Sequence, residues 1–182
     1  GGTAFAEQVK YPVGAGPRAI DVGDIDGDGD FDLAVANEWS GNVSILRNNG
    51  GGQFAAAASY AAGTSPSALA FGQFNDDNRD GRIDARDAPD LAVANFDSNN
   101  VSILLNQGNG TFAPCVNVPA GRGAFSIAVG DLNRDGNPDL AVANVLSNSV
   151  SVLRNGGDGS FGLHAALAAG VGPPCVAVGD TD

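Results

Sequence analysis

Short stretches in which apolar and polar or small residues alternate recur along the whole chain. In the segment 19–23, Ile20 and Val22 alternate with small or polar neighbours. This alternation, together with many β-branched residues, is typical of strands, and no useful length of chain keeps the helical period of about 3.6 residues. Turns rich in Gly and Asn separate the stretches and indicate hairpins. The pattern therefore predicts an all-β chain.

The strands return in a repeating order. The phrase "DLAVAN" occurs three times, at 32–37, 90–95 and 139–144. A phrase like "GPRAIDVGD" precedes each copy, and a phrase like "NVSILRNNGGGQF" follows it. Each unit is therefore predicted to have four strands, the fourth resembling 54–60 in the first unit. The middle unit carries an insertion in the acidic loop after its first strand.

Four-stranded meanders repeated every ~40–50 residues are typical of β-propeller blades. A β-solenoid is the alternative, but its coils are usually shorter and less hairpin-like. The sequence predicts a single β-propeller region over 1–182, made of four-stranded antiparallel blades. Three complete blades are expected at 11–59, 60–117 and 118–166, with partial blades at 1–10 and 167–182. The partial blades match a fourth strand ("TAFAEQVKYPVG") and a first strand ("GPPCVAVGD"). Because three blades are too few to close a propeller, we expect either a longer parent chain or self-association. The absence of Met also favours a processed chain or a fragment.

An acidic loop joins the first and second strands of each unit. The first of these loops, "DIDGDGDFD", places carboxylates at alternate positions, and each carboxylate must find water, a donor or a cation. A solvated turn built on Asx hydrogen bonds is the ordinary interpretation. Recurrence of the pattern in each unit favours a cage of oxygen ligands for Ca²⁺. Without Cys or His nearby Zn²⁺ is a poor fit, and Mg²⁺ prefers fewer carboxylates.

The predicted calcium ligands follow one spacing in every unit. They are Asp24, Asp26, Asp28, Asp30 (by its carbonyl) and Asp32 in the first loop, Asp76, Asn78, Asp80, Arg82 (by its carbonyl), Asp84 and Asp87 in the second, Asp131, Asn133, Asp135, Asn137 (by its carbonyl) and Asp139 in the third, and Asp180 and Asp182 at the C-terminal end. A glycine stands at position 6 of each complete loop, where the chain must fold back. Asp84, Asp87 and Asp90 all remain candidates for closing the second loop.

The net charge of −12 supports the cation interpretation. Most of the acids lie in these loops, where they would repel one another without cations. Three Ca²⁺ ions would halve the net charge. The same acidity argues against nucleic-acid binding, and no apolar run reaches the ~18 residues of a membrane helix, so membrane insertion is not expected.

The phrases "DIDGDGDFDLAVAN" and "DLNRDGNPDLAVAN" resemble the FG-GAP/VCBS repeat, found in integrin α-subunit propellers and in many secreted bacterial proteins. The inserted "DDNRDGRIDARD" is closely similar to an EF-hand or dockerin-type calcium loop. Here "AN" stands where GAP would, and only Phe71 and Gly72 match the FG element, which favours the bacterial VCBS type. The resemblance covers nearly the whole chain. It implies a propeller of about seven blades, calcium in the loops and a secreted or cell-surface setting.

No catalytic constellation stands out, because His164 is the single histidine and no carboxylate pair lies outside the acidic loops. We therefore expect a calcium-stabilised extracellular binding or adhesion module without catalytic activity, whose partner is a protein or glycan at the cell surface. The alternatives are a lectin, a structural unit of a surface assembly, or an accessory module of a larger secreted enzyme. Trp39 can stack on a sugar, but Asp97 and Leu146 replace it in the other units. Cys115 and Cys175 are expected to be unpaired.

Overall fold

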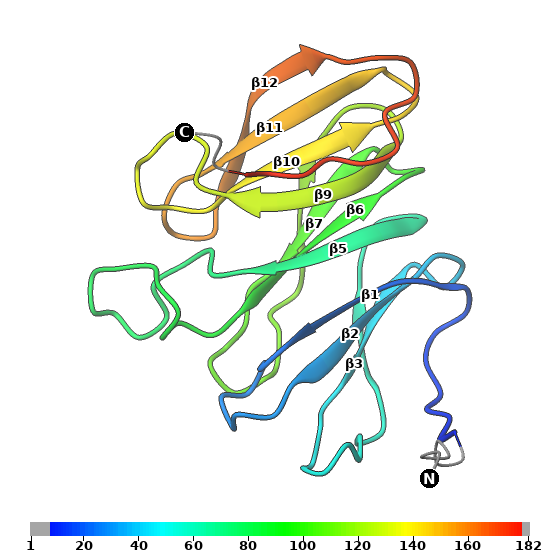
Figure 1. The fold of residues 1–182 in the computed structure, drawn as a ribbon, viewed down its shortest axis with the longest axis vertical. Coiled ribbons are helices and arrows are strands. Elements are labelled where there is room, and N and C mark those ends of the chain that lie inside the picture. The colour runs from blue at the N-terminus through cyan, green and yellow to red at the C-terminus, as the bar shows by residue number, and fades with distance from the viewer. Residues whose placement is uncertain (1–7, 180–182) are drawn as a thin grey trace, which may run out of the picture.

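The computed structural model describes residues 8–179, which form β-strands, turns and extended segments without a helix (Figure 1). The strands make three four-stranded antiparallel sheets in chain order. The first sheet contains β1 (Pro17–Gly23), β2 (Asp32–Asn37), β3 (Asn42–Leu46) and β4 (Ala58–Ala61). The second contains β5 (Pro66–Gly72), β6 (Asp90–Asn95), β7 (Asn100–Leu104) and β8 (Val116–Pro119). The third contains β9 (Ala124–Gly130), β10 (Asp139–Asn144), β11 (Ser149–Asn155) and β12 (Phe161–Ala168). A membrane-spanning helix is not found among the described residues.

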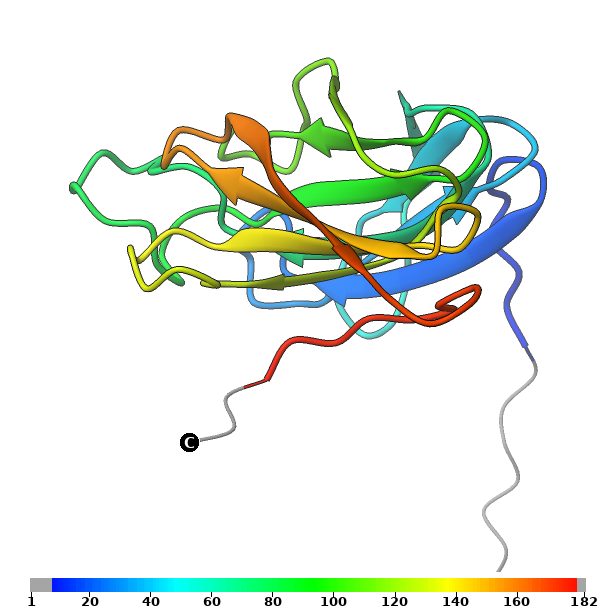
Figure 2. The ribbon, with the colours of Figure 1, turned by 90° about the horizontal axis from the view of Figure 1, so that it is seen from above.

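The three sheets are consecutive blades of a β-propeller, so the predicted all-β fold class is confirmed. We call them blade 1, blade 2 and blade 3. The first strands β1, β5 and β9 contact one another in that order, and the outer strands spread away from them (Figures 1 and 2). The described sheets do not close into a ring.

The "DLAVAN" strands explain how the blades pack. On each second strand, Leu and Val point to one face of the sheet and two alanines to the other. Ala34 and Ala36 of β2 share a buried core with Leu91 and Val93 of β6. The same arrangement recurs between β6 and β10. Small methyl groups that face larger side chains allow adjacent sheets to pack at the high density of protein interiors.

The two end blades leave apolar side chains exposed. Ile20 is 61% exposed and Val22 54% exposed on β1, while Leu163 and Leu167 of β12 are each 55% exposed. The longer parent chain and the self-association both stay predictions.

The structure differs from the sequence-based expectation at both ends. No paired strand forms in the described residues 8–16 or 173–179, which the sequence assigns to a terminal fourth strand and first strand, so the partial blades stay predictions. Residues 1–7 and 180–182, including Asp180 and Asp182, lie outside the described residues. Val176 N–H nevertheless donates to Ser126 Oγ of β9 (3.2 Å), in the manner of a neighbouring innermost strand. The first strand of a blade forms its backbone hydrogen bonds with the second strand of the same blade. Without a second strand beside it, this segment has no partner for regular pairing.

The fourth strand of blade 1 begins later than predicted, at Ala58 instead of residue 54. Phe54 makes only an isolated bridge with Asn48, and Ala55 N–H donates to Arg47 O (2.7 Å). Regular pairing with β3 starts where Ala58 lies opposite Ile45. Both cysteines are free, as expected.

Candidate metal centre

Three acidic loops connect the first strand of each blade to its second strand, and they lie along one edge of the blades (left in Figure 1). We call them loop 1 (24–32), loop 2 (76–87) and loop 3 (131–139). Loop 2 lies within the longer connection between β5 and β6.

The first Asp of each loop folds the backbone around its own carboxylate. Asp24 Oδ1 accepts the N–H groups of Gly27 (2.9 Å) and Asp28 (3.1 Å), and its Oδ2 accepts that of Gly29 (3.0 Å). The N–H groups at positions 5 and 6 bind the first Asp in the other loops as well: Asp80 and Gly81 to Asp76, and Asp135 and Gly136 to Asp131. Loop 2 therefore starts at Asp76 and not at Gln73, the residue that aligns with Asp24.

Backbone dihedral angles give the same register. Position 6 has a left-handed φ in all three loops: +90° at Gly29, +86° at Gly81 and +88° at Gly136. A residue with a Cβ rarely adopts such an angle, which explains the glycine at this position. Position 4 is also left-handed, at Gly27 (φ +77°), Arg79 (φ +60°) and Arg134 (φ +64°).

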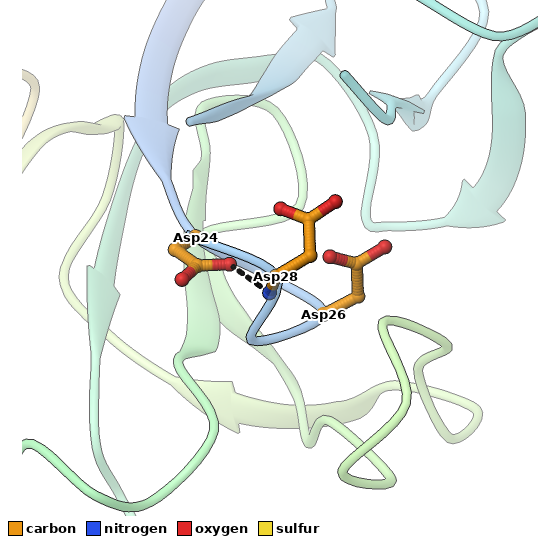
Figure 3. A group of neighbouring side chains, drawn as sticks. All are labelled: Asp24, Asp26 and Asp28. Carbon is orange, nitrogen blue, oxygen red and sulfur yellow. Dashed lines mark hydrogen bonds between the residues drawn. The ribbon is translucent and has the colours of Figure 1, made fainter. Parts of the chain in front are cut away.

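Loop 1 brings three carboxylates together. One oxygen each of Asp24, Asp26 and Asp28 lies within 4.8 Å of the other two (Figure 3). Asp26 Oδ1 is buried without a hydrogen-bond partner, and Asp26 Oδ2 lies 3.9 Å from Arg47 Nη1. A buried, unpaired carboxylate oxygen needs a compensating partner. The set of hard oxygen donors fits Ca²⁺.

Position 9 of loop 1 and loop 3 has a second role. Asp32, a predicted ligand, is fully buried, and its Oδ2 and Oδ1 accept the N–H groups of Ile25 (2.9 Å) and Asn48 (2.7 Å). Two other buried acids at the start of a second strand make the same pair of bonds: Asp90 with Phe74 and Asn106, and Asp139 with Leu132 and Asn155. Each carboxylate oxygen keeps a further lone pair, so Asp32 and Asp139 still fit a ligand role.

Burial is the largest influence on the pKa of Asp90 and of Asp32. Desolvation raises the pKa of Asp90 to about 7, even though hydrogen bonds from the backbone of Asn106, Phe74 and Asn75 act in the opposite direction. Burial also raises the pKa of Asp32 and of Asp77 above the usual range. At exposed Asp131, by contrast, the N–H of Gly136 and other backbone donors lower the pKa. Ionised Asp90 is thus held at a considerable cost in solvation.

Loop 2 closes through Asp87. This side chain is 3% exposed, and its carboxylate accepts the N–H groups of Asp77 (3.0 Å), Asn78 (3.3 Å) and Asp84 (2.8 Å). Asp84 instead lies beside exposed Arg86, with 3.6 Å between Oδ2 and Nη1. Of the three acids that the sequence left open, Asp87 is the one that turns into the loop.

The remaining predicted ligands make hydrogen bonds to backbone N–H groups within their own loops. In loop 1, Asp30 N–H donates to Asp28 Oδ1 (2.8 Å). In loop 2, Asn78 Oδ1 accepts the N–H of Asp80 (2.9 Å), and Asp80 Oδ1 accepts that of Arg82 (3.0 Å).

Loop 3 repeats this ladder with two asparagines in place of acids. Asn133 Oδ1 accepts the N–H of Asp135 (2.8 Å), and Asp135 Oδ1 accepts that of Asn137 (2.8 Å). Within residues 8–179, only loop 1 gathers three acidic side chains into one group. Loop 1 is therefore the strongest candidate metal centre.

Three asparagines, at the end of a third strand or two residues beyond it, contact these loops, although the sequence-based interpretation did not single them out. They are Asn48, Asn106 and Asn155. A signal was present, because each occupies the same place in its unit, after "NVSILR", "NVSILL" and "SVSVLR". Their side chains reach backbone carbonyls that cannot be identified from spacing.

The acidic loops of blades 1 and 2 lie beside a common cavity of about 590 Å³. Asp24, Asp26, Asp77 and Asp87 contribute to its lining. The negative charges of the two loops therefore face shared solvent.

Comparison with known proteins gives a family and a fold. A family described as "FG-GAP-like repeat" matches residues 24–85 and 78–142. No curated protein sequence matches the chain.

Solved structures with similar folds include the complex of BBS1N with ARL6DN in two forms. The mercury-soaked form has a TM-score of 0.59 at 17% identity, covering 89% of this chain and 47% of the other. The lead-soaked form has a TM-score of 0.62 at 19% identity, covering 97% and 52%. A lectin from Agrocybe aegerita that recognises non-reducing terminal N-acetylglucosamine has a TM-score of 0.56 at 21% identity, covering 83% and 38%. This chain spans about half the length of the first two proteins.

Proposed function

Because the chain belongs to the FG-GAP-like repeat family, we propose that it is a calcium-stabilised, non-catalytic β-propeller module that binds its ligand outside the cell. The observation that carries the calcium part is loop 1, where three carboxylates converge and Asp26 Oδ1 is buried without a partner. The common register of loops 2 and 3 supports the same role for them. A bound ion would neutralise charges that otherwise repel one another across each loop.

In loop 1 the ion would be held by the carboxylates of Asp24, Asp26 and Asp28, with the carbonyl of Asp30 and the free lone pairs of Asp32. The equivalent groups would serve in loop 2 and loop 3. The exposure of the acidic loops to solvent suits the modest calcium affinity of extracellular modules, which work at the high free calcium concentration outside the cell. This fit supports the proposed secreted or cell-surface setting.

Asp28→Ala is expected to abolish one calcium site and leave the other two near normal. The change removes a carboxylate from the loop 1 group, whereas loops 2 and 3 lie in other blades. Isothermal titration calorimetry with CaCl₂ measures the number of sites. The control is Glu38→Ala, an acid of the β2–β3 turn that pairs with Arg18 (2.9 Å) away from the loops. A full complement of sites in the Asp28 variant would contradict the assigned ligand register.

The ligand is proposed to be a protein or a glycan. BBS1N forms a complex with the protein ARL6DN, and the Agrocybe lectin recognises a sugar. These two neighbours support a protein or a glycan as the class of ligand.

A glycan is the second candidate because of the exposed indole of Trp39, which is 81% exposed. It lies in the β2–β3 turn beside a hollow of about 490 Å³ between blades 1 and 2, whose lining includes Glu38, Thr64, Ser98 and Asn117. An aromatic face next to several polar groups is suited to stacking on a sugar ring.

Trp39→Ala is expected to weaken binding to any glycan that the chain retains on a glycan array by tenfold or more. Loss of the stacking surface removes about 1.5 kcal/mol or more of contact energy, which corresponds to that factor. Leu146→Ala, at the equivalent position of blade 3, is the matched control and should leave binding unchanged. Equal binding by both variants would remove Trp39 from the glycan hypothesis.

A further inference from the structure

Two asparagine side chains cross from one blade to the acidic region of the preceding blade. Asn106, which follows β7 of blade 2, donates from Nδ2 to Ile25 O (2.8 Å). Ile25 lies in loop 1 between the candidate ligands Asp24 and Asp26. Asn155 of blade 3 likewise donates from Nδ2 to Phe74 O (2.9 Å), two residues before loop 2 begins.

Asn106 is held firmly by its own blade. Its backbone N–H donates to Asp90 Oδ1 (2.8 Å), and its Oδ1 accepts the N–H of Gly108 (3.0 Å). A second bond from Nδ2 reaches Pro89 O (3.2 Å), and the residue is 3% exposed. The position of the amide group over loop 1 is therefore fixed by blade 2.

These bonds join loop 3, the residues on either side of loop 2, and loop 1. Ile25 uses its carbonyl for Asn106 and its N–H for Asp32. Phe74 uses its N–H for Asp90, and its carbonyl accepts both Asn155 Nδ2 and the N–H of Gly159 (2.9 Å). The resulting hydrogen-bonded series consists of residues that are at most 4% exposed: Asp139, Asn155, Phe74, Asp90, Asn106, Ile25 and Asp32. Groups this deeply buried cannot replace a lost partner with bulk water without local opening.

We propose that Asn106 and Asn155 are positioning residues, each of which holds the cation loop of the preceding blade in its ligating shape. Cation binding in one blade is thereby coupled to the packing of the next blade. The proposal rests on the proposed calcium function of these loops. Removal of the Asn106 donor leaves the Ile25 carbonyl unpaired between two ligands, and loss of such an outer contact typically weakens metal affinity by about 10–100-fold.

The proposal predicts an effect that crosses from one blade to another. Asn106→Asp retains the shape of the side chain and the acceptor for Gly108, but it removes the donor to Ile25. The position-6 glycines Gly29, Gly81 and Gly136 give one amide reporter for each loop. We follow a CaCl₂ titration of Asn106→Asp by ¹H–¹⁵N correlation spectra. The calcium concentration at which the Gly29 signal is half-shifted is expected to rise about tenfold or more, while that of Gly136 stays unchanged.

Asn155→Asp is the matched variant. It should raise the calcium midpoint at Gly81, whose loop begins two residues after Phe74, and leave Gly29 as in the unsubstituted chain. The rise should be smaller than that at Gly29 in Asn106→Asp, because the Phe74 carbonyl keeps the N–H of Gly159 as a donor. A merely structural role would instead weaken the loop of the variant's own blade or all three loops alike. Either of those results, or an unchanged Gly29 in Asn106→Asp, would overturn the proposal.

Hydrogen exchange in EDTA tests the proposal without calcium. The amides of Gly27, Asp28 and Gly29, which donate to Asp24, should exchange about tenfold faster in Asn106→Asp, while those of loop 3 keep their rates. If the buried carboxylate prevents folding, Asn106→Ser gives an uncharged side chain too short to reach Ile25. If the unsubstituted chain does not titrate with calcium, the proposed function fails, and the exchange rates still decide the positioning role: unchanged loop 1 rates overturn it.

Discussion

Removing calcium with EDTA is expected to lower the melting temperature of the protein by about ten degrees or more. A ligand that binds only the folded state stabilises it by mass action, by about 2.7 kcal/mol for one site at a free concentration 100 times its Kd. For a chain of this size, 1 kcal/mol corresponds to roughly 2–4 °C in melting temperature. The unfolded chain does not hold Asp24, Asp26 and Asp28 together, so most of the binding energy of loop 1 becomes stability. Circular dichroism melts with excess CaCl₂ and with EDTA measure the difference.

A melt with MgCl₂ in place of CaCl₂ is the control, and it should resemble the EDTA melt because Mg²⁺ favours fewer carboxylates and retains water. Equal melting temperatures with calcium and with EDTA, in protein shown to be free of metal, would contradict a calcium-stabilised fold.

Acid should have opposite effects in the two buffers. With calcium, protonation of the ligands releases the ion, so the free energy of unfolding falls as the pH falls. In EDTA, the pKa of Asp90 is about 7 when folded and 3.8 when unfolded, so the folded state binds more protons between these values. The contribution of Asp90 to the free energy of unfolding therefore increases as the pH falls from about 7 towards 4. Urea unfolding at pH 8 and pH 5.5 in each buffer measures both directions.

The repeat made the fold predictable. "DLAVAN" has the two-residue period of a strand, and its three copies form β2, β6 and β10, the second strands of the blades, at the predicted residues. The acidic loops were predictable because a glycine is needed at position 6, where φ is left-handed. These features depend on residues close together in sequence.

Contacts between distant residues could not be predicted in the same way. Asn106 and Ile25 are 81 positions apart, and nothing in the local pattern indicates that a side-chain amide reaches a carbonyl of the preceding blade. The late start of β4 is a local effect instead: the isolated bridge between Asn48 and Phe54 precedes the regular pairing, which begins at Ala58. The sequence showed Asp90 as a possible metal ligand, whereas the structure shows it fully buried, accepting the N–H groups of Phe74 and Asn106.

Asp90→Ala is expected to lower the free energy of unfolding by about 2–6 kcal/mol. The change leaves two buried donors, the N–H groups of Phe74 and Asn106, without their acceptor, and each such loss costs about 1–3 kcal/mol. Phe74 is fully buried and Asn106 nearly so, and therefore water does not compensate without local opening. Urea unfolding in EDTA separates this effect from metal binding.

Two variants give the scale for this measurement. Asp90→Asn keeps one acceptor oxygen and should lose about half as much, since its amide nitrogen cannot accept the second N–H. Glu38→Ala removes a half-exposed acid paired with Arg18 and should change stability by less than about 1 kcal/mol. The loss in Asp90→Ala should also be larger at pH 5.5 than at pH 8, because the wild-type carboxyl is ionised against a desolvation penalty at the higher pH. A loss no larger than that of Glu38→Ala would show that Asp90 does not hold the backbone at Phe74 and Asn106 in place, and it would remove the central link of the hydrogen-bonded series.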